Sequence, residues 1–324
     1  MMNGKKVILA ITVNVLVAML FCWVVLFIFN SHFSRYDKRK LYSLCIKAED
    51  GTRFWKPNSR TSVADIDYTI NSLGFRDREF DIKKPKGQYR ILCVGDSFTF
   101  GEGVKAQEAY PKVLETMLQT KYKNVEVINT GVSGYNTVDE YLYIRNKLLS
   151  FNADLIILGF YIGNDPEDPS LPFNQEMKEN NDIGKRSSLE VYFRHKKKWE
   201  EFSKMNYWEK YRAALYDPEG SQWKTCRAAL ESIRDLAASK GIALLVLVIP
   251  ETDIEPNSNL IYHLQLAETL NELQIKFIDA SLSVEKADYV YEVVGHGDYH
   301  PAAKVHAIYA RLLFEMIKIK HEVV

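Results

Sequence analysis

The sequence contains few cysteines, and none of them are close together. The four in the 324 residues are Cys22, Cys45, Cys93 and Cys226. Because Cys22 falls in an apolar stretch and leaves an odd number elsewhere, the pattern favours neither a disulfide framework nor a cysteine-rich zinc site. Cys93 lies in a strand-like apolar run and Cys226 on the apolar side of an expected helix, where cysteine behaves as a small buried hydrophobe.

An excess of charge of either sign is also missing. Lysine plus arginine and aspartate plus glutamate each number 42. This balance gives no indication of a nucleic-acid partner, and we expect none. Internal repeats and low-complexity segments are lacking as well. The length outside the apolar N-terminal stretch, roughly 280 residues, is expected to form one main domain with a short preceding segment.

One long hydrophobic run is present, close to the N-terminus. Residues 7–29 carry no charge and follow Lys5 and Lys6. At about 1.5 Å per residue, such a run is long enough to cross a bilayer. It exceeds the roughly 7 to 15 apolar residues of a signal peptide, and no small-x-small cleavage site follows. We therefore predict an N-terminal tail at 1–6 and a single-pass transmembrane helix at 7–29, with the membrane as a partner.

The basic residues around this run bear on its orientation. Four follow it closely, namely Arg35, Lys38, Arg39 and Lys40. They outnumber the two lysines that precede it, and the positive-inside rule alone therefore places the following domain in the cytoplasm.

Short apolar runs alternate with longer amphipathic stretches from Arg90 onward. The expected strands are Ile91–Val94, Val125–Asn129, Leu155–Phe160, Ala243–Ile249 and Lys276–Ile278. Several are continuously apolar, which is typical of parallel strands covered on both faces in βαβ units. The sequence therefore predicts an α/β fold, a three-layer α/β/α sandwich around a parallel five-stranded sheet.

Two expected helices show clear apolar stripes. Between Trp223 and Lys240, apolar residues recur at spacings of three and four, and Gly241 follows as a C-cap. A final helix carries its predicted stripe on Val305, Ile308, Leu312 and Met316.

Two regions depart from this alternation. Residues 30–88 are mixed in composition and punctuated by turn residues, so we expect a stalk or linker that becomes ordered near Asn71. Residues 165–221 form a polar, aromatic insertion in a main domain at 89–320. The insertion contains the basic run Arg194–Lys198, which we interpret as a solvated helix face in preference to a phosphate or membrane-surface patch. Because it follows a strand, it is well placed to shape a binding site.

A candidate nucleophile follows the first expected strand, in the sequence Gly95-Asp96-Ser97-Phe98-Thr99. The carboxyl ends of parallel strands are where α/β folds place their active sites. A serine there acts as a nucleophile only if a base takes its proton and donors stabilise an oxyanion. The glycines that follow lack the Gly-Lys-Ser/Thr of a phosphate-binding loop. Ser97 is therefore the candidate nucleophile.

Candidate oxyanion donors follow two further strands. Gly134 lies in the block that begins at Asn129, and Asn164 lies between Gly163 and Asp165. A glycine presents its backbone N–H at close range, and an asparagine side chain offers an N–H₂ group. Taken alone, each is as well explained as a turn or cap residue. Three strand ends that meet at one sheet edge favour the functional interpretation.

A candidate base precedes the final helix, in the segment Asp298–Pro301. A histidine beside an aspartate at a loop–helix junction is a good general base, so we assign that role to His300, with Asp298 to orient its ring. His306 lies within the expected helix and is assigned to packing or hydrogen bonding. The alternative, a metal site that adds His296 to these residues, lacks a familiar ligand spacing. We expect neither a metal nor a cofactor.

In order and spacing, these four segments resemble the sequence blocks of the SGNH/GDSL hydrolase superfamily over residues from about 71 to 318. The resemblance implies a flavodoxin-like SGNH hydrolase fold with Ser97 as nucleophile and His300 as base. It also implies an oxyanion hole made by the N–H groups of Ser97 and Gly134 and the side chain of Asn164. The heptapeptide from Asn71 to Asp77 looks like the lead-in of membrane-anchored bacterial members, which implies an extracytoplasmic domain.

One departure from the family pattern concerns the aspartate. The family's last block usually places it three residues before the histidine, a position that Gly297 holds here, whereas Asp298 lies two before. The choice between a Ser-His-Asp triad and a Ser-His dyad therefore stays open.

The resemblance implies a serine esterase or acylhydrolase that acts on an O-acyl ester, with an acylated glycan or a lipid as candidate substrate. An O-acetyltransferase of cell-envelope polysaccharide uses the same apparatus and is an alternative. A non-catalytic envelope-assembly protein on the same scaffold is another, although it would have no need of Ser97, Asn164 and His300 together.

Overall fold

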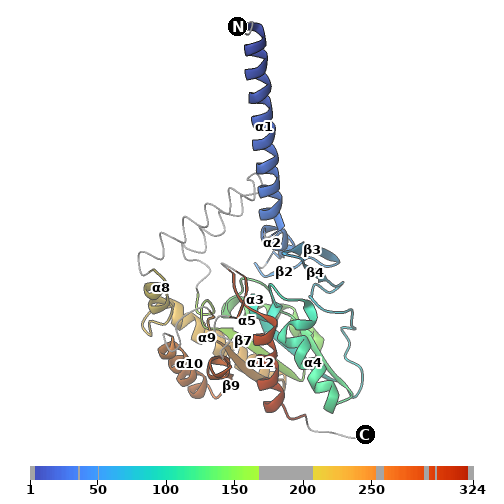
Figure 1. Ribbon diagram of the computed structural model, residues 1–324. Helices are drawn as coiled ribbons and strands as arrows, with labels where there is room; N and C mark the ends of the chain where they lie inside the picture. Colours follow the sequence, from blue (N-terminus) through green and yellow to red (C-terminus); the bar gives the residue numbers. More distant parts are fainter. Residues whose placement is uncertain are drawn as a thin grey trace.

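A computed structural model of the chain describes residues 4–35, 37–49, 51–167, 207–252, 259–287, 292–295 and 298–319. A long N-terminal helix, α1 (Gly4–Arg35), projects from one end of an α/β body (Figure 1). Between α1 and the sheet lie a short helix and two antiparallel hairpins. These elements are α2 (Arg39–Tyr42), β1 (Cys45–Lys47) with β2 (Arg53–Trp55), and β3 (Ser59–Val63) with β4 (Ile66–Ile70).

The central sheet has five strands, all parallel, in the order β6-β5-β7-β8-β9. Their bounds are β5 (Tyr89–Gly95), β6 (Val125–Asn129), β7 (Leu155–Tyr161), β8 (Ala243–Ile249) and β9 (Lys276–Asp279). The predicted five-stranded parallel sheet and all five predicted strands are confirmed. The chain runs from β5 to β6 on one side and then crosses to β7 on the other. The strand order therefore reverses beside β5, which is where ligands bind in such sheets.

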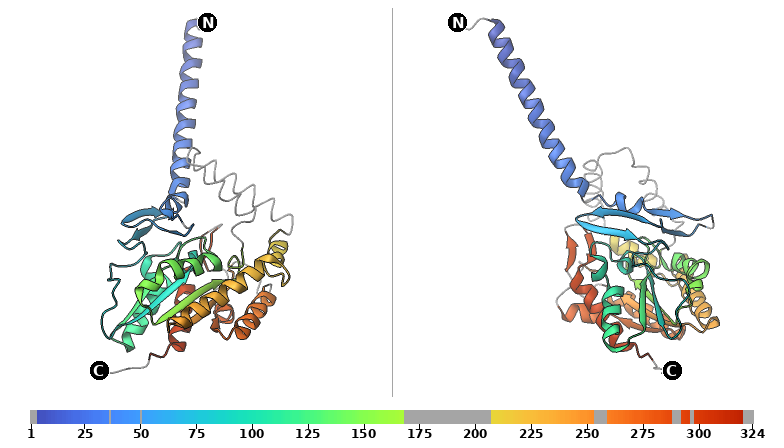
Figure 2. Two further views of the ribbon diagram at one scale, coloured as in Figure 1. Left: turned by 180° about the vertical axis from the view of Figure 1, so that it is seen from behind. Right: turned by 90° about the vertical axis from the view of Figure 1, so that its right-hand side faces the viewer.

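Helices cover both faces of the sheet, which confirms the three-layer sandwich (Figure 2). One face packs against α5 (Thr137–Asn146), α9 (Ser221–Ser239) and α10 (Leu260–Glu272), and the other against α4 (Tyr110–Lys121), α11 (Ser281–Lys286) and α12 (Ala303–Met316). Alternate residues of β5 serve the two layers, because successive side chains of a strand point to opposite faces. Leu92 and Val94 enter one core cluster, while Ile91 and Cys93 enter the other.

The remaining elements lie around the sheet's edges. They are α3 (Ser97–Phe100), the 3-10 helices Ala106–Glu108 and Leu148–Phe151, α8 (Tyr207–Leu215), and the hairpin of β10 (Val293–Gly295) with β11 (Asp298–Pro301).

The predicted helix from Trp223 is confirmed as α9, and its predicted stripe is buried. Gly241 follows it with φ +66°, a left-handed conformation that suits a C-cap glycine. The final helix is also confirmed, and three residues of its predicted stripe lie at the core, since Val305 is buried and Ile308 and Leu312 pack partly buried against it. The centre of its buried face is nevertheless displaced from the predicted stripe. Val305, Tyr309 and Leu313 are fully buried, whereas Met316 is 43% exposed. The apolar pattern missed this face because it includes His306 and the hydroxyl-bearing Tyr309.

Ordered structure begins well before Asn71, contrary to the sequence-based expectation. Leu41, Trp55 and Tyr68 are buried in the same core cluster as the sheet. The indole Nε1 of Trp55 donates to the carbonyl of Gly131 at 3.0 Å, and its ring stacks on Phe100 at 4.6 Å. The four strands of this segment have only three to five residues each. Runs this short carry little periodicity, which explains why the pattern did not predict them.

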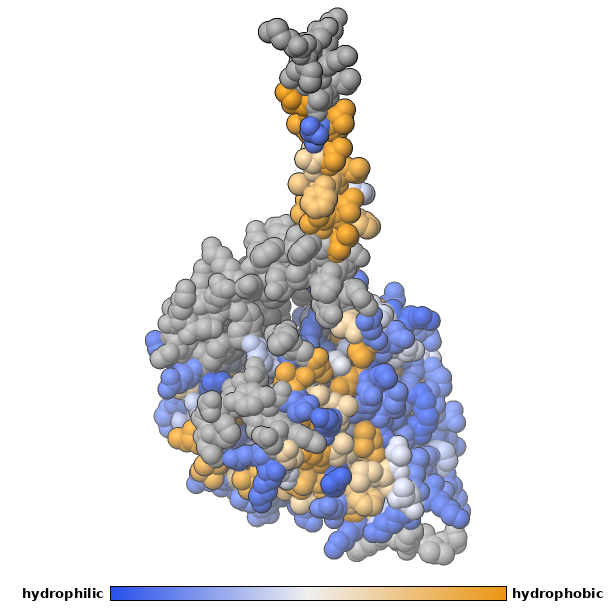
Figure 3. Space-filling model, viewed as in Figure 1, coloured by the Kyte–Doolittle hydropathy of each residue, from blue (hydrophilic) through white to orange (hydrophobic). Residues whose placement is uncertain are grey.

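The cysteines and α1 agree with the composition. All four cysteines are free, and Cys93 and Cys226 are buried as predicted. Within the described residues, one helix is long and apolar enough to span a membrane. It contains the window Ile11–Ile28, which has a mean hydropathy of 2.7 and no buried residue (Figure 3). An N-terminal signal sequence meets the same criteria.

Candidate active site

Ser97 occupies a sharp strand-to-helix turn. β5 ends at Gly95, and the Asp96 carboxylate caps α3 by accepting the Phe98 backbone N–H at 2.8 Å. A Cβ at Gly95 would lie 2.1 Å from Thr99 Oγ1, so only glycine allows the chain to turn so closely. Ser97 is the first helical residue, and it is 8% exposed. The turn therefore presents its hydroxyl at the carboxyl edge of the sheet.

His300 and Asp298 reach Ser97 from β11. His300 Nε2 lies 2.7 Å from Ser97 Oγ, and His300 Nδ1 lies 2.6 Å from Asp298 Oδ1. If Nδ1 carries the proton and donates it to Asp298, the lone pair of Nε2 accepts the serine hydroxyl. The Phe98 ring, 5.1 Å from the imidazole centroid, packs beside the histidine. The structure thus brings together the predicted nucleophile, base and aspartate in one hydrogen-bonded chain.

The second histidine of the block, His306, has a different environment. Its Nδ1 accepts the backbone N–H of Tyr110 at 3.2 Å, and the side chain is fully buried. Burial lowers the pKa of His306 to about 3, so the ring stays neutral at pH 7. Its contacts are with α4, which agrees with the predicted packing role.

Three loops meet at the oxyanion-hole candidates. The Val132 N–H donates to the carbonyl of Gly95 at 2.9 Å, which ties the loop after β6 to the end of β5. Gly134, in that loop, has φ +75°, a conformation that favours glycine. Among the described residues, the backbone N–H groups of Ser97 and Gly134 have no hydrogen-bond partner, so both are available to a ligand.

Asn164 approaches the same place from the turn after β7. Its Nδ2 donates to Asp96 Oδ2 at 3.1 Å, directly beside the candidate nucleophile. Because an amide nitrogen carries two hydrogens, this bond orients the group and leaves its second N–H free to donate.

Two charged residues of the site were missed by sequence reasoning, namely Lys38 and Glu102. Lys38 Nζ lies 3.0 Å from Asp298 Oδ2 and 2.7 Å from Glu102 Oε1. The carboxylate of Glu102 is 1% exposed and also accepts the hydroxyls of Tyr42 at 3.1 Å and Ser133 at 2.9 Å. The sequence counted Lys38 only as a charge beside an apolar run. Its partner Asp298 lies 260 residues away in the chain, and no local pattern joins the two.

These neighbours determine the charge of the aspartate. Burial alone would raise the pKa of Asp298, but hydrogen bonding to His300 and the charge of Lys38 hold it well below its usual range. Similarly, burial would raise the pKa of Glu102, and the ammonium of Lys38 lowers it. Both carboxylates are therefore ionised at neutral pH.

A second group of acids, Asp96, Glu140 and Asp165, lies behind the turn. All three are at most 1% exposed. Burial raises the pKa of Asp96 to about 6, and burial together with mutual repulsion raises the pKa values of Glu140 and Asp165 well above their usual range. Among the described residues, neither oxygen of Glu140 has a hydrogen-bond partner.

Other candidates from the sequence lie outside this site. No group of three or more His, Cys, Asp or Glu residues within the described residues is arranged to hold a metal. His296 and the basic run Arg194–Lys198 lie outside the described residues.

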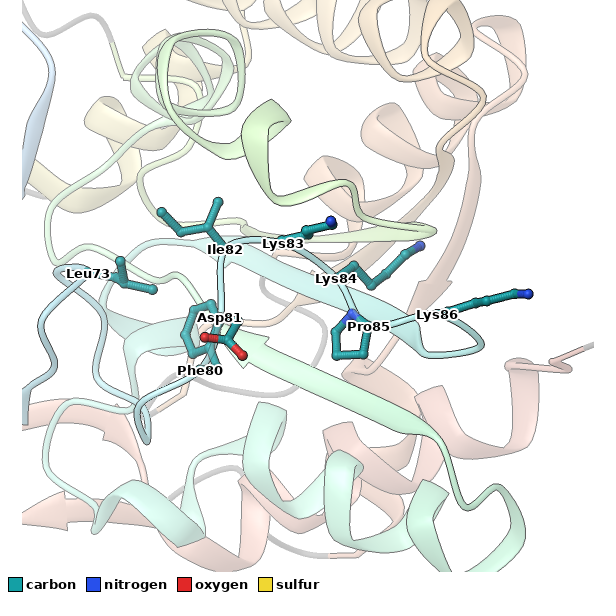
Figure 4. Close-up of a pocket in the computed structure, with 8 residues that line it drawn as sticks. All are labelled: Leu73, Phe80, Asp81, Ile82, Lys83, Lys84, Pro85 and Lys86. Carbon is teal, nitrogen blue, oxygen red and sulfur yellow. The ribbon is translucent and has the colours of Figure 1, made fainter.

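A hollow of about 780 Å³ is lined by Leu73 and residues 80–86 (Figure 4). The guanidinium of Arg90, at the beginning of β5, donates to the carbonyl of Ile82 in its lining at 2.7 Å. The hollow therefore lies at the opposite end of the strand from Ser97, and we do not assign it to the reaction.

Comparisons with known proteins add a family match. Residues 93–308 match the GDSL-like Lipase/Acylhydrolase family. An uncharacterized protein of Mycoplasma pneumoniae (strain ATCC 29342 / M129 / Subtype 1) is 37% identical over 84 residues, which are 24% of this chain and 9% of that protein. The chain thus spans less than a tenth of the length of this curated relative.

The solved structures that are similar to the chain include the following two. One is a protein from Desulfitobacterium hafniense DCB-2 assigned to the G-D-S-L family of lipolytic proteins. It is 16% identical, with a TM-score of 0.46, over 71% of this chain and 100% of that one. The other is a catalytic mutant of an acetylxylan esterase from Geobacillus stearothermophilus. It is 15% identical, with a TM-score of 0.46, over 72% of this chain and 95% of that one.

Proposed function

We propose that this chain, which belongs to the GDSL-like lipase/acylhydrolase family of ester-hydrolysing enzymes, cleaves an O-acyl ester with Ser97, His300 and Asp298. The observation that carries the proposal is the unbroken chain of short contacts from Ser97 Oγ through the imidazole to Asp298 Oδ1, at 2.7 and 2.6 Å. An activated serine needs a base in hydrogen-bond reach and a third group that orients the base.

The proposed reaction begins when His300 Nε2 takes the Ser97 proton as Oγ attacks the ester carbonyl carbon. The resulting oxyanion is stabilised by the N–H groups of Ser97 and Gly134 and the amide of Asn164. Collapse of the tetrahedral intermediate breaks the bond to the alkoxy oxygen, and the imidazolium gives that oxygen its proton. Water, deprotonated by His300, then attacks the acyl-serine and releases the carboxylic acid.

For the substrate, we propose an acylated glycan or a lipid close to a membrane surface. The support is the position of the site near the base of α1: Lys38 follows the helix end at Arg35 closely and contacts Asp298 at 3.0 Å. We propose that residues 7–29 span the membrane and that the domain at 89–320 faces away from the cytoplasm. We also propose that the insertion at residues 165–221 completes the substrate pocket.

The test is hydrolysis of p-nitrophenyl acetate by the full-length protein in detergent. Ser97→Ala and His300→Ala are each expected to lower the rate by roughly a thousandfold or more, because either change removes the nucleophile–base pair. Ser150→Ala, at an exposed serine in a 3-10 helix distant from the site, is the matched control. Equal rates in all four proteins would reject the site.

The same assay, extended to an acetylated donor and a glycan acceptor, separates hydrolysis from transfer. A hydrolase releases free acetate whether or not the glycan is present. Accumulation of acetylated glycan at the expense of acetate would instead establish the O-acetyltransferase alternative.

A further inference from the structure

The segment that follows α1 enters the catalytic network. Lys38 lies just beyond the last residue of the helix, Arg35. Its ammonium is 3.0 Å from Asp298 Oδ2, on the oxygen that His300 does not use, and 3.4 Å from His300 Nδ1. Because the 2.6 Å bond to Asp298 engages the Nδ1 proton, the longer lysine contact is a charge contact with the ring.

Glu102 holds this ammonium in place. Lys38 Nζ lies 2.7 Å from Glu102 Oε1, which also accepts the hydroxyl of Tyr42 from α2. The other oxygen of Glu102 accepts Ser133 Oγ at 2.9 Å, in the loop that carries Gly134. One buried carboxylate thus joins the segment after α1 to two of the loops that form the site. Without that segment, Glu102 would be a buried carboxylate with no ion pair in direct contact among the described residues, which is costly.

We propose that Lys38 is a positioning residue for Asp298 and His300, so that the active site is complete only when the segment 37–42 is docked against Glu102. The proposal rests on the proposed function and deepens it. Lys38 fixes the second oxygen of Asp298, which aligns the first with Nδ1. Its positive charge, 3.4 Å from Nδ1, also opposes a second positive charge on the imidazole.

The charges that face His300 determine the sign of this effect. Asp298 lies on its own strand, Lys38 comes from the segment after α1, Glu102 follows α3, Asp96 caps α3, and the neutral His306 lies on α12. Among the described residues, Lys38 is the one cation in contact with the imidazole. Among the described residues named above, its removal leaves only anions and a neutral ring, which do not oppose a positive charge on the imidazole.

The experiment measures kcat/KM for p-nitrophenyl acetate against pH with the full-length protein in detergent. On the acid side of this profile, kcat/KM falls as the pH is lowered; this part of the curve is called the acid limb. In Lys38→Met, the acid limb is expected to move to higher pH by about one unit, which is the smallest shift that a charge at this distance usually causes. On the acid limb, the ratio of variant to wild-type kcat/KM is therefore expected to be roughly tenfold lower than the same ratio at the plateau. Lys38→Arg keeps the charge and is expected to keep the wild-type limb. Lys40→Met, at an exposed lysine of α2, the short helix that Lys38 precedes, is the control for general effects on the segment.

The outcomes separate this proposal from the proposed function. If Ser97→Ala is inactive but Lys38→Met has the same limb as the wild type, the role of Lys38 is rejected and the hydrolase site stands. An equal shift in Lys40→Met also rejects it, since a non-specific change in the segment then explains the result. If the wild type neither hydrolyses the ester nor reacts with a fluorophosphonate at Ser97, both proposals fail.

Discussion

At the scale of single residues, the contact between Asp298 and His300 follows from the backbone they share. Both lie on β11, where residues two apart point to the same side of the strand. The aspartate therefore reaches Nδ1 of the histidine across 2.6 Å without a loop to bring it back. A two-residue spacing is thus compatible with a triad when the segment is extended.

The exchange Asp298→Asn tests whether this aspartate takes part in the reaction. The amide has nearly the same shape but does not stabilise the imidazolium, and it favours the wrong tautomer of His300. We expect kcat to fall by about 10⁴, as the same exchange does in a Ser-His-Asp protease. Steady-state kinetics with p-nitrophenyl acetate measure it, and far-UV circular dichroism checks that the fold is retained. A loss of less than about tenfold would instead establish a Ser-His dyad.

Asn164 offers a second test at this scale. Its Nδ2 donates to Asp96 Oδ2 at 3.1 Å, beside the proposed nucleophile. Asn164→Ala is expected to lower kcat by about 10² to 10³ and leave KM nearly unchanged, because the donor acts mainly in the transition state. Asn124→Ala, at an exposed residue before β6, is the control. An unchanged kcat would remove Asn164 from the oxyanion hole.

At the scale of elements, the segment before the sheet supports the turn that carries the proposed nucleophile. Arg76 is 1% exposed, and its guanidinium donates to the carbonyls of Gly101 at 2.6 Å and Val104 at 2.7 Å. The same group lies over the rings of Tyr68 and Phe100, at 4.3 and 5.0 Å. One side chain thus joins the hairpin of β3 and β4 to the loop that follows α3.

Arg76→Lys tests this connection. Lysine keeps the charge but replaces the planar fork by a single ammonium, which does not bond to the separate carbonyls together. We expect a loss of about 3 kcal/mol in stability, from two lost charged hydrogen bonds, and a fall of roughly 10 °C in the unfolding midpoint. Tryptophan fluorescence on heating measures it. The exposed Arg60→Lys, on β3, should unfold within a degree or two of the wild type.

The sequence predicted the features that depend on neighbouring residues, and it missed contacts between residues far apart in the chain. Several sheet strands contain continuous apolar runs, and the candidate residues Ser97 and Asn164 stand directly after two of these runs, so the chain order places them at one edge. Lys38 and Glu102 belong to no periodic pattern, and their contact depends on how the hairpins pack. For the same reason, the sequence predicted the final helix but not that Tyr309 and Leu313 would be at the centre of its buried face.

At the scale of the whole molecule, the buried acids behind the site make stability depend on pH. Burial raises the pKa of Glu140 well above its usual value, so the folded state keeps this carboxyl neutral where the unfolded chain ionises it. Its contribution is fully present below the unfolded pKa, about 4.3, and is lost as pH rises through the folded value. Asp165 acts in the same direction. The folded protein is therefore expected to lose stability from mildly acidic to alkaline pH through these groups.

Glu140→Gln removes one of these ionisations while keeping nearly the same volume. At pH 8, we expect the free energy of unfolding of the variant to exceed that of the wild type by roughly 1 kcal/mol or more, and its unfolding temperature to be higher. At pH 5, we expect a smaller difference. Thermal unfolding at both pH values measures it. The matched control is Glu231→Gln, whose side chain is 53% exposed on α9. Equal differences at the two pH values would contradict a neutral Glu140.

At the same scale, two contacts bear on the side of the membrane on which the proposed span would place the domain. Of the four basic residues after the apolar run, Lys38 is engaged by Glu102 at 2.7 Å, and Arg39 donates through Nε to Asp37 at 2.7 Å. These two charges have a role in the folded domain, so the positive-inside rule is not needed to explain their presence. We therefore keep the proposal that the domain is extracytoplasmic.

A single engineered cysteine tests that orientation in intact cells. Cys93 and Cys226 are buried, and Cys45 is replaced by serine, so that the soluble domain has no accessible native cysteine to react with the reagent. Lys224→Cys on α9, where the lysine side chain is 57% exposed, is expected to react with a membrane-impermeant maleimide before any lysis. The same background without the new cysteine controls for Cys22, which lies within the apolar helix. Labelling that appears only after the cells are permeabilised would place the domain in the cytoplasm, and with it the ester that Ser97 is proposed to attack.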